Sequence, residues 1–193
     1  MVATYAVQRI TGTSGAPVRT TVTESRFRTD DTNTLDLTNA CLIDSVTRYS
    51  YWTSICILLG GTFSEISNLR IHSAGDITWT LGTGGKIKLG NHDTGDIGVA
   101  DASYEQATGT PGVTGNDLEA SHSSFSGQTT KSVDLNTILV GAPKVVDTTK
   151  YTAVGRTKHV VLQAEIKTDG SSGVFDSSNS KDKTITFLVD EIN

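Results

Sequence analysis

Residues 61–72 read GTFSEISNLRIH and residues 159–168 read HVVLQAEIKT, and in both stretches apolar and polar side chains alternate. A third such stretch, KTITFLVDE at residues 183–191, follows the second after a segment rich in Gly, Ser and Asp. A period of two places one set of side chains on a core face and the other set in water. No helical period replaces this alternation elsewhere. The sequence therefore predicts an all-β protein, a two-sheet antiparallel β-sandwich of jelly-roll or immunoglobulin-like type with long polar loops.

Length and composition agree with this fold class. The chain has 193 residues, enough to bury a core within a single domain spanning 1–193. Its hydrophobic fraction is only 36%, and it contains 19 glycines. Thr suits exposed strand faces, while Gly, Ser, Asn and Asp supply turns. This composition is typical of a β-protein with many loops.

The segments between the alternating stretches divide into expected strands and loops. Residues 1–28 are polar enough to form an edge strand or an N-terminal arm that packs on another subunit. The apolar run in 50–59 predicts a central strand, and shorter strands are expected at 35–43 and 132–140. Glycines at 82–85 indicate a hairpin turn between 76–81 and 86–89. A polar hairpin loop is expected at 169–182.

The long segment 90–131 has few large apolar residues and is expected to be a loop excursion from the sandwich. Such loops often bind ligands, because a rigid scaffold displays them.

Net charge excludes one broad class of partner. The formal charge is −5, whereas nucleic-acid binding requires a basic face for the phosphates. Arg26 and Arg28 come closest to a basic patch, and we expect them on the solvent face of a strand. No apolar run approaches the ~20 residues that cross a bilayer, so no membrane contact is expected. Without a visible signal sequence, synthesis in the cytoplasm is expected, with Cys41 and Cys56 as free, buried thiols.

The sequence contains partial matches to motifs for catalysis or metal binding, but none has the spacing or the structural surroundings that the motif requires. Lys86 follows Gly85 as in a phosphate-binding loop, but the next residue begins a strand rather than a helix. No nucleophile elbow occurs, and the segment 169–182 offers oxygen ligands for calcium without regular spacing. The four histidines lie far apart, and His92 with Asp93 and Asp96 lacks further ligands.

Sugar hydrolysis uses a pair of carboxylates that lie close in the folded protein, and the two residues need not be close in the sequence. The candidates are Asp76, Glu105, Glu165 and Asp190. Each also fits an exposed position on a strand or loop, so we expect no enzyme activity, no cofactor and no catalytic residues.

A few aromatic residues and one histidine are candidates for an interface. Tyr51 and Trp52 are adjacent and point to opposite faces of a strand, so one is expected in the core and the other at a glycan or a neighbouring subunit. Trp79 raises the same alternatives. His159 opens a strand and is expected to face solvent or a partner subunit. With Arg26 and Arg28, these residues form the candidate interface set.

At Phe63–Ile71, Val160–Ile166 and Lys183–Glu191 the chain resembles small β-sandwich virion proteins of tailed phages and related archaeal viruses. This resemblance implies a β-sandwich displayed on a virus particle, such as a capsid decoration protein or a tail or neck component. It carries over no catalytic residues, and the chain lacks the coiled-coil or glycine-repeat shaft of a long fibre.

The function expected from these observations is a non-enzymatic virion structural protein, namely a capsid decoration protein that stabilises the shell. Its expected partners are further copies of the chain, a trimer being one arrangement, and the major capsid or another virion protein. It would be made in the host cytoplasm and located in the virion. The alternative is a carbohydrate- or receptor-binding module that uses Trp52 or Trp79 and the loop at 90–131.

Overall fold

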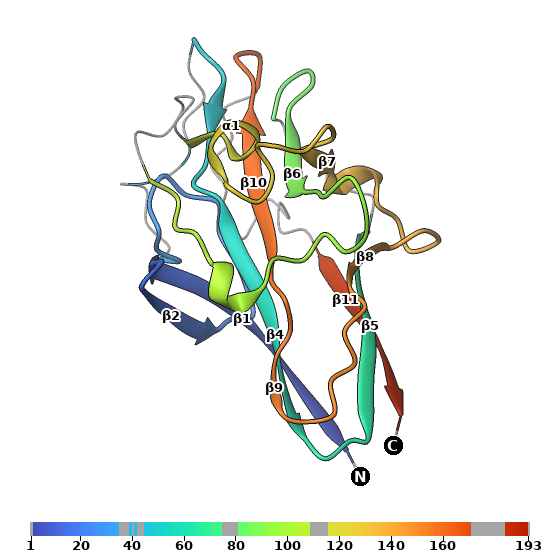
Figure 1. Ribbon diagram of the computed structural model, residues 1–193. Coiled ribbons are helices and arrows are strands. Elements are labelled where there is room, and N and C mark those ends of the chain that lie inside the picture. The colour runs from blue at the N-terminus through green and yellow to red at the C-terminus, as the bar shows by residue number, and fades with distance from the viewer. Residues whose placement is uncertain are drawn as a thin grey trace.

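The computed structural model describes residues 2–34, 39, 41, 45–74, 81–108, 116–170 and 184–192. Over these ranges the chain forms two antiparallel sheets packed face to face, which confirms the all-β sandwich (Figure 1). Its assignment to the jelly-roll or immunoglobulin-like type stays a prediction. Among the described residues, no helix is long and apolar enough to cross a membrane.

The large sheet has eight strands in the order β2-β1-β4-β10-β6-β7, with β3 paired to β10 and β9 paired to β4. Its strands are β1 (Ala3–Thr13), β2 (Ala16–Thr21), β3 (Arg48–Tyr49), β4 (Thr53–Gly61), β6 (Lys86–Gly90), β7 (Ser132–Asp134), β9 (Gly155–Arg156) and β10 (Val160–Ile166). The small sheet has the order β11-β5-β8. Its strands are β5 (Glu65–Ser73), β8 (Lys144–Asp147) and β11 (Ile185–Ile192).

The core lies between the sheets and uses the alternating side chains that the sequence indicated. On β10, Val160, Leu162 and Ile166 are buried in the main apolar cluster. On β5, Leu69 and Ile71 pack into the same cluster. The predicted central strand at 50–59 is confirmed as β4, which is flanked by β1 and β10 in the large sheet.

The two C-terminal strands do not form the expected hairpin. β10 pairs with β3, β4 and β6 in the large sheet, whereas β11 pairs with β5 in the small one. The chain therefore crosses between sheets after β10. The expected loop at 169–182 and the expected strands at 35–43 and 76–81 lie largely outside the described residues.

Residues 1–28 are not an arm that leaves the domain. β1 pairs with β4 from Ala3 to Ile10 and with β2 on its other side, so it is an interior strand of the large sheet. β2 is the outermost strand, but it ends at Thr21, and residues 22–27 form a loop instead of continuing the predicted strand. The arm hypothesis fails because backbone hydrogen bonds along β1 are satisfied within the chain itself.

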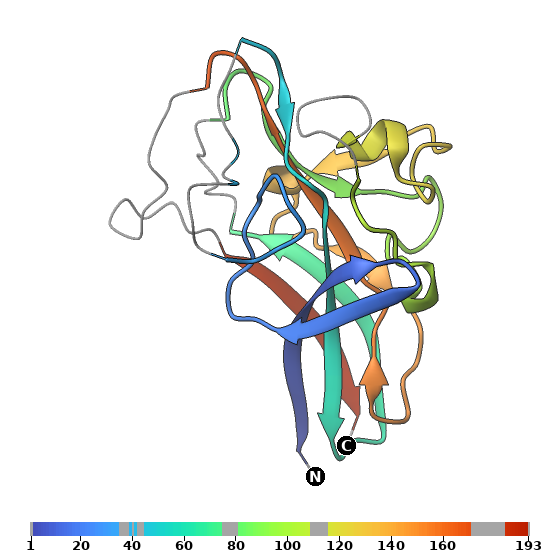
Figure 2. The ribbon, with the colours of Figure 1, turned by 90° about the vertical axis from the view of Figure 1, so that its left-hand side faces the viewer.

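Residues 90–108 and 116–131 pack on the face of the large sheet that points away from the main core, and Figure 2 shows this green-to-yellow segment along one side of the domain. In its described part it contains a single turn of 3-10 helix at Asp101–Ser103 and the short helix α1 (Leu118–Ser121). Leu118 and Phe125 are fully buried and pack with Trp52 and Val161 in a second apolar cluster. The segment is mainly loop where it is described, but it packs on the sheet through these side chains and has an apolar cluster of its own.

Because this loop forms a third layer, the polar face of β10 is not solvated. Gln163 is fully buried; its Oε1 accepts a hydrogen bond from the backbone N of Leu118 at 2.9 Å, and its Nε2 donates to the carbonyls of Ser50 and Asn116. Glu165 is 6% exposed. The alternation that predicted solvent exposure is real, but the face it marks is covered by the chain's own loop.

The expected strand at 132–140 is shorter than predicted. β7 ends at Asp134, and Leu135–Thr137 forms a 3-10 turn. Asp134 caps this turn, since its side chain accepts a hydrogen bond from the backbone N of Asn136. Both cysteines are free as predicted, but only Cys56 is fully buried, whereas Cys41 is half-buried.

Candidate functional site

The residues of the candidate interface set do not gather on one surface. Trp52 is only 4% exposed and donates from Nε1 to the carbonyl of Glu105 at 2.8 Å, so it is an anchor of the second apolar cluster. Tyr51 is half-buried against that cluster. Trp79 lies outside the described residues.

His159 is fully buried, which contradicts its expected place at solvent or a partner subunit. It lies on the face of β10 that the 90–131 loop covers, with its ring 6.2 Å from that of Tyr104. Arg28 is also buried, at 4% exposure, because its Nε donates to Asp30 at 2.7 Å within the loop that follows β2. Arg26, like Tyr51, is half-buried, and it pairs with Glu24.

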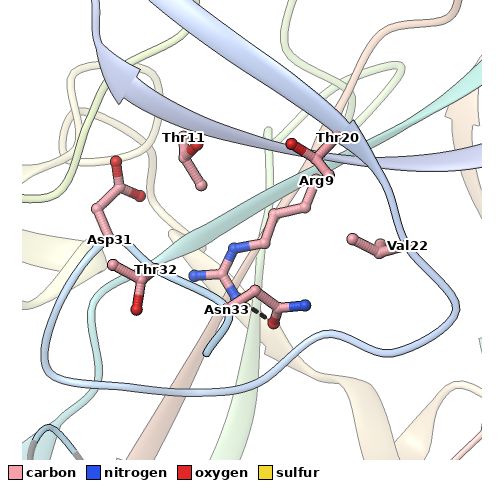
Figure 3. Close-up of a pocket in the computed structure, with 7 residues that line it drawn as sticks. All are labelled: Arg9, Thr11, Thr20, Val22, Asp31, Thr32 and Asn33. Carbon is pink, nitrogen blue, oxygen red and sulfur yellow. Dashed lines mark hydrogen bonds between the residues drawn. The ribbon is translucent and has the colours of Figure 1, made fainter. Parts of the chain in front are cut away.

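A pocket of about 290 Å³ lies beside this loop, between β1, β2 and residues 31–33. Its lining is Arg9, Thr11, Thr20, Val22, Asp31, Thr32 and Asn33 (Figure 3). The Arg9 side chain extends across it toward Asn33, with Asp31 and Thr32 to one side and Val22 to the other. Arg9 is 2% exposed.

Arg9 is well held but incompletely paired. One terminal nitrogen donates to the carbonyl of Arg26 and to Oδ1 of Asn33, both at 2.9 Å. Nε is buried and has no hydrogen-bond partner among the described residues. Burial lowers the pKa of Arg9, against the opposing fields of Asp31 and Asp30. A buried guanidinium with a spare donor favours an added acceptor at this place.

Asp31 contributes a hydrogen-bond acceptor to the same pocket, in contrast to the donors of Arg9. Its Oδ2 accepts from the backbone N of Gly12 at 2.6 Å and from Nε2 of Gln106 at 2.9 Å. Burial raises the pKa of Asp31, although these donors and Arg9 counteract it. With the hydroxyls of Thr11 and Thr32, the pocket presents donors and acceptors that suit a hydroxylated small molecule.

A second polar site lies under α1, on the covered face of the large sheet. Lys88 of β6 is 1% exposed, and its Nζ lies 2.7 Å from Asp117, 3.0 Å from Glu119 and 3.4 Å from Glu165. The Tyr49 ring centroid is 4.6 Å from the same nitrogen. This cluster, which we call the Lys88 cluster, joins β6 and β10 to the start of α1.

Further partners balance the charges of the Lys88 cluster. Lys86 lies 3.5 Å from Glu119, and Lys167 contacts Glu165. Ser132 donates from Oγ to Glu119 at 2.5 Å. The hydrogen bonds of Ser132 and Lys88 lower the pKa of Glu119 despite its burial. Sequence pattern missed this cluster because Lys86 and Lys88 alternate with Ile87 and Leu89 as solvent-facing residues would.

Two histidines are enclosed between the 90–131 loop and the sheet. His122 packs against Trp52 and Phe125, with ring centroids 5.2 Å and 4.7 Å away. Nε2 of His122 and both ring nitrogens of His159 are buried without a hydrogen-bond partner among the described residues. Burial lowers the pKa of each histidine to about 4, so both are neutral at pH 7.

The acidic residues considered for chemistry mainly fasten loops. Asp93 accepts from the backbone N atoms of Thr129 and Thr130, and Asp96 from Thr148 and Lys158. Glu105 accepts from Ser123. Asp190 pairs with Arg70, and Glu165 belongs to the Lys88 cluster. Asp76 lies outside the described residues.

Metal-binding groups of three or more His, Cys, Asp or Glu residues are absent from the part of the chain that the structure describes. No family model matches this chain, and the comparisons with curated proteins and with solved structures also give no match.

Proposed function

We propose that this protein is a non-enzymatic structural component of a virus particle, a decoration protein that joins neighbouring subunits through an exposed strand edge. The observation that carries the proposal is the outer edge of β11. Over its length β11 pairs with β5 alone among the described residues. The resemblance to small virion β-sandwich proteins supports the same function.

The composition of β11 favours its use as a docking edge. Its residues Ile185–Val189 are half-buried, and the strand contains neither Pro nor a basic residue. Natural edge strands are usually protected by Pro, Lys or short length. β2, one of the two edge strands of the large sheet, has such protection, since it contains Pro17 and Arg19, and Arg19 pairs with Asp101 at 2.7 Å.

We take a second copy of this chain as the occupant of the β11 edge. The register with β5 is unbroken over Ile185–Leu188, and a bulge follows before Asp190. Antiparallel pairing of two copies over this regular part places the acidic residues Asp190 and Glu191 of the two copies at opposite ends of the contact. The edge is therefore self-complementary, and repeated contacts of this kind gain strength from the symmetry of a shell.

The substitution Leu188→Lys tests this edge. Phe187 and Val189 pack on the core, so the alternating Leu188 lies on the outer face, and a lysine there is tolerated by the fold. A charged lysine within the paired stretch of each copy, facing Ile185 of the other copy, should weaken self-association at least about tenfold in sedimentation equilibrium. Val18→Lys on β2, at a side chain 57% exposed, is the matched control and should not change association. Equal association of both variants and the native chain would contradict the proposal.

The polar pocket beside Arg9 favours a carbohydrate- or receptor-binding module as the second candidate. Its site would be the lining of that pocket, because Trp52 is buried and unavailable as a stacking platform, while Trp79, the other tryptophan considered for this role, lies outside the described residues. A glycan array should then give binding that Arg9→Lys reduces, since Lys cannot reproduce the fork of guanidinium donors. An array without binding to the native chain would eliminate this candidate.

A further inference from the structure

Lys88 and Asp117 are held together at a position where the lysine is fully buried and the aspartate is mostly buried. Lys88 is 1% and Asp117 16% exposed in its side chain, and Nζ lies 2.7 Å from Oδ1. The pair connects a strand of the sheet to the N-cap of α1, because the Asp117 side chain accepts a hydrogen bond from the backbone N of Glu119 at 3.1 Å. The fold therefore holds in contact an amine and a carboxyl group, the two groups that can condense to an amide.

We propose that Lys88 and Asp117 form an intramolecular amide cross-link between Nζ and Cγ. Holding an amine against a carboxyl group replaces an encounter in solution by an intramolecular reaction, which lowers the barrier to condensation. Burial of the Lys88 amine also limits the access of bulk solvent that would otherwise reverse the condensation.

The step balances without an external oxidant or reductant. Lys88 gives up a proton to a neighbouring carboxylate, and Asp117 takes up a proton to become a neutral acid. The lone pair of Nζ then attacks Cγ and forms the N–C bond of a tetrahedral intermediate. The nitrogen passes a second proton through a neighbouring carboxylate to the hydroxyl oxygen, and the C–O bond to that oxygen breaks as it departs as one molecule of water.

The remaining members of the Lys88 cluster supply the proton transfers. Glu119 and Glu165 lie 3.0 Å and 3.4 Å from Nζ, within reach of its protons. The backbone N–H of Glu119 donates to Oδ1 of Asp117, which stabilises negative charge on that oxygen in the tetrahedral intermediate. The Tyr49 ring covers another side of the lysine.

The carboxylates also favour the charged lysine. Hydrogen bonds and the fields of Asp117 and Glu165 raise the pKa of Lys88 despite its burial. Reaction therefore proceeds from a minor neutral form and is slow, which suffices for a bond made once in the lifetime of a molecule. The product fastens the 90–131 loop to the sheet by closing the chain between residues 88 and 117 covalently.

Intact mass spectrometry of the denatured full-length protein tests the cross-link. The native chain is expected to be one water lighter than its sequence, and a protease digest should give a branched peptide that joins the segments of Lys88 and Asp117. Lys88→Arg keeps the positive charge but removes the nucleophile, so it should have the full mass. Glu165→Gln should form the link more slowly, so a larger share of freshly synthesised chains should have the full sequence mass.

Two controls make the result decisive. Asp169–Gly170 is a sequence that can lose water as a cyclic imide, and that loss would persist in Lys88→Arg. Circular dichroism shows whether each variant is folded. A native chain at full sequence mass, with Lys88 and Asp117 in separate linear peptides, would overturn the proposal, as would an equal water loss in folded Lys88→Arg.

Discussion

Lowering the pH from 7 to 5 is expected to destabilise this protein by about 4 kcal/mol through His122 and His159, or about 2 kcal/mol for each. Burial lowers the pKa of both from 6.5 to about 4 in the folded chain. The unfolded chain therefore binds more protons between these values. The stability that the neutral histidines provide is complete above pH 6.5 and is lost as the pH falls toward 4.

The groups that face the two histidines limit this effect without cancelling it. Glu105 lies 3.8 Å from Nδ1 of His122 and favours its protonated form, whereas His92 opposes it. Asp101 and Arg19 act on His159 in opposite directions. Burial is the largest contribution to the pKa shift of both histidines, so the pKa of each is lowered in the folded chain.

Urea unfolding of the native chain at pH 7, 6 and 5 measures the effect. The double variant His122→Phe/His159→Phe keeps aromatic rings in both places and should lose much less stability over the same range, provided that it is folded at pH 7. An equal loss in the native chain and the double variant would show that other groups cause the acid sensitivity.

Phe125→Ala is expected to cost about 3–5 kcal/mol of unfolding free energy, the range for deleting a buried aromatic ring. Phe125 is fully buried, and its ring fits against Gly90, where an added Cβ would lie 2.4 Å from the ring. It also contacts the rings of His92 and His122. The substitution therefore opens a cavity under the 90–131 loop.

Leu139→Ala is the matched control, because Leu139 is 48% exposed and its truncation leaves no buried cavity. It should cost less than about 1 kcal/mol in the same urea titration. If Phe125→Ala cost no more than Leu139→Ala, the 90–131 loop would not be a structural layer of the domain.

The sequence predicts the β-sandwich well because its apolar residues keep strand periodicity. Ile57 and Leu59 on β4 and Leu69 and Ile71 on β5 are buried where alternation requires. The burial of these residues follows from the two-residue period of a strand, which can be read from the local sequence. The pairing of β11 with β5 instead of β10 depends on a crossover between sheets, which local sequence does not contain.

The sites were missed for one physical reason. Lys88, Gln163 and His159 occupy positions that alternation assigns to solvent, yet the 90–131 loop covers them. That segment has low apolar content, and nothing in its composition indicates that Leu118 and Phe125 anchor it to the sheet. Arg9 was missed similarly, because the loop that encloses it follows β2 and has no strand or helix pattern.

A three-layer arrangement agrees with the proposed function in a particle. The outer loop is fastened to the sheet by the Lys88 cluster and by buried aromatic rings, while β11, in the small sheet, has no strand partner on its outer edge among the described residues. In the proposal, the 90–131 loop stabilises the domain, and the β11 edge joins copies of the chain. The two properties can therefore be changed separately, by Phe125→Ala and Leu188→Lys respectively.

The most direct test of the virion proposal is quantitative mass spectrometry of purified virus particles from the source of this sequence. A copy number near that of the major shell protein is the result that a decoration protein requires. A few to a few dozen copies would place the protein in the tail, neck or vertex instead. Its absence from particles would contradict the proposal and leave the carbohydrate- or receptor-binding module as the remaining candidate.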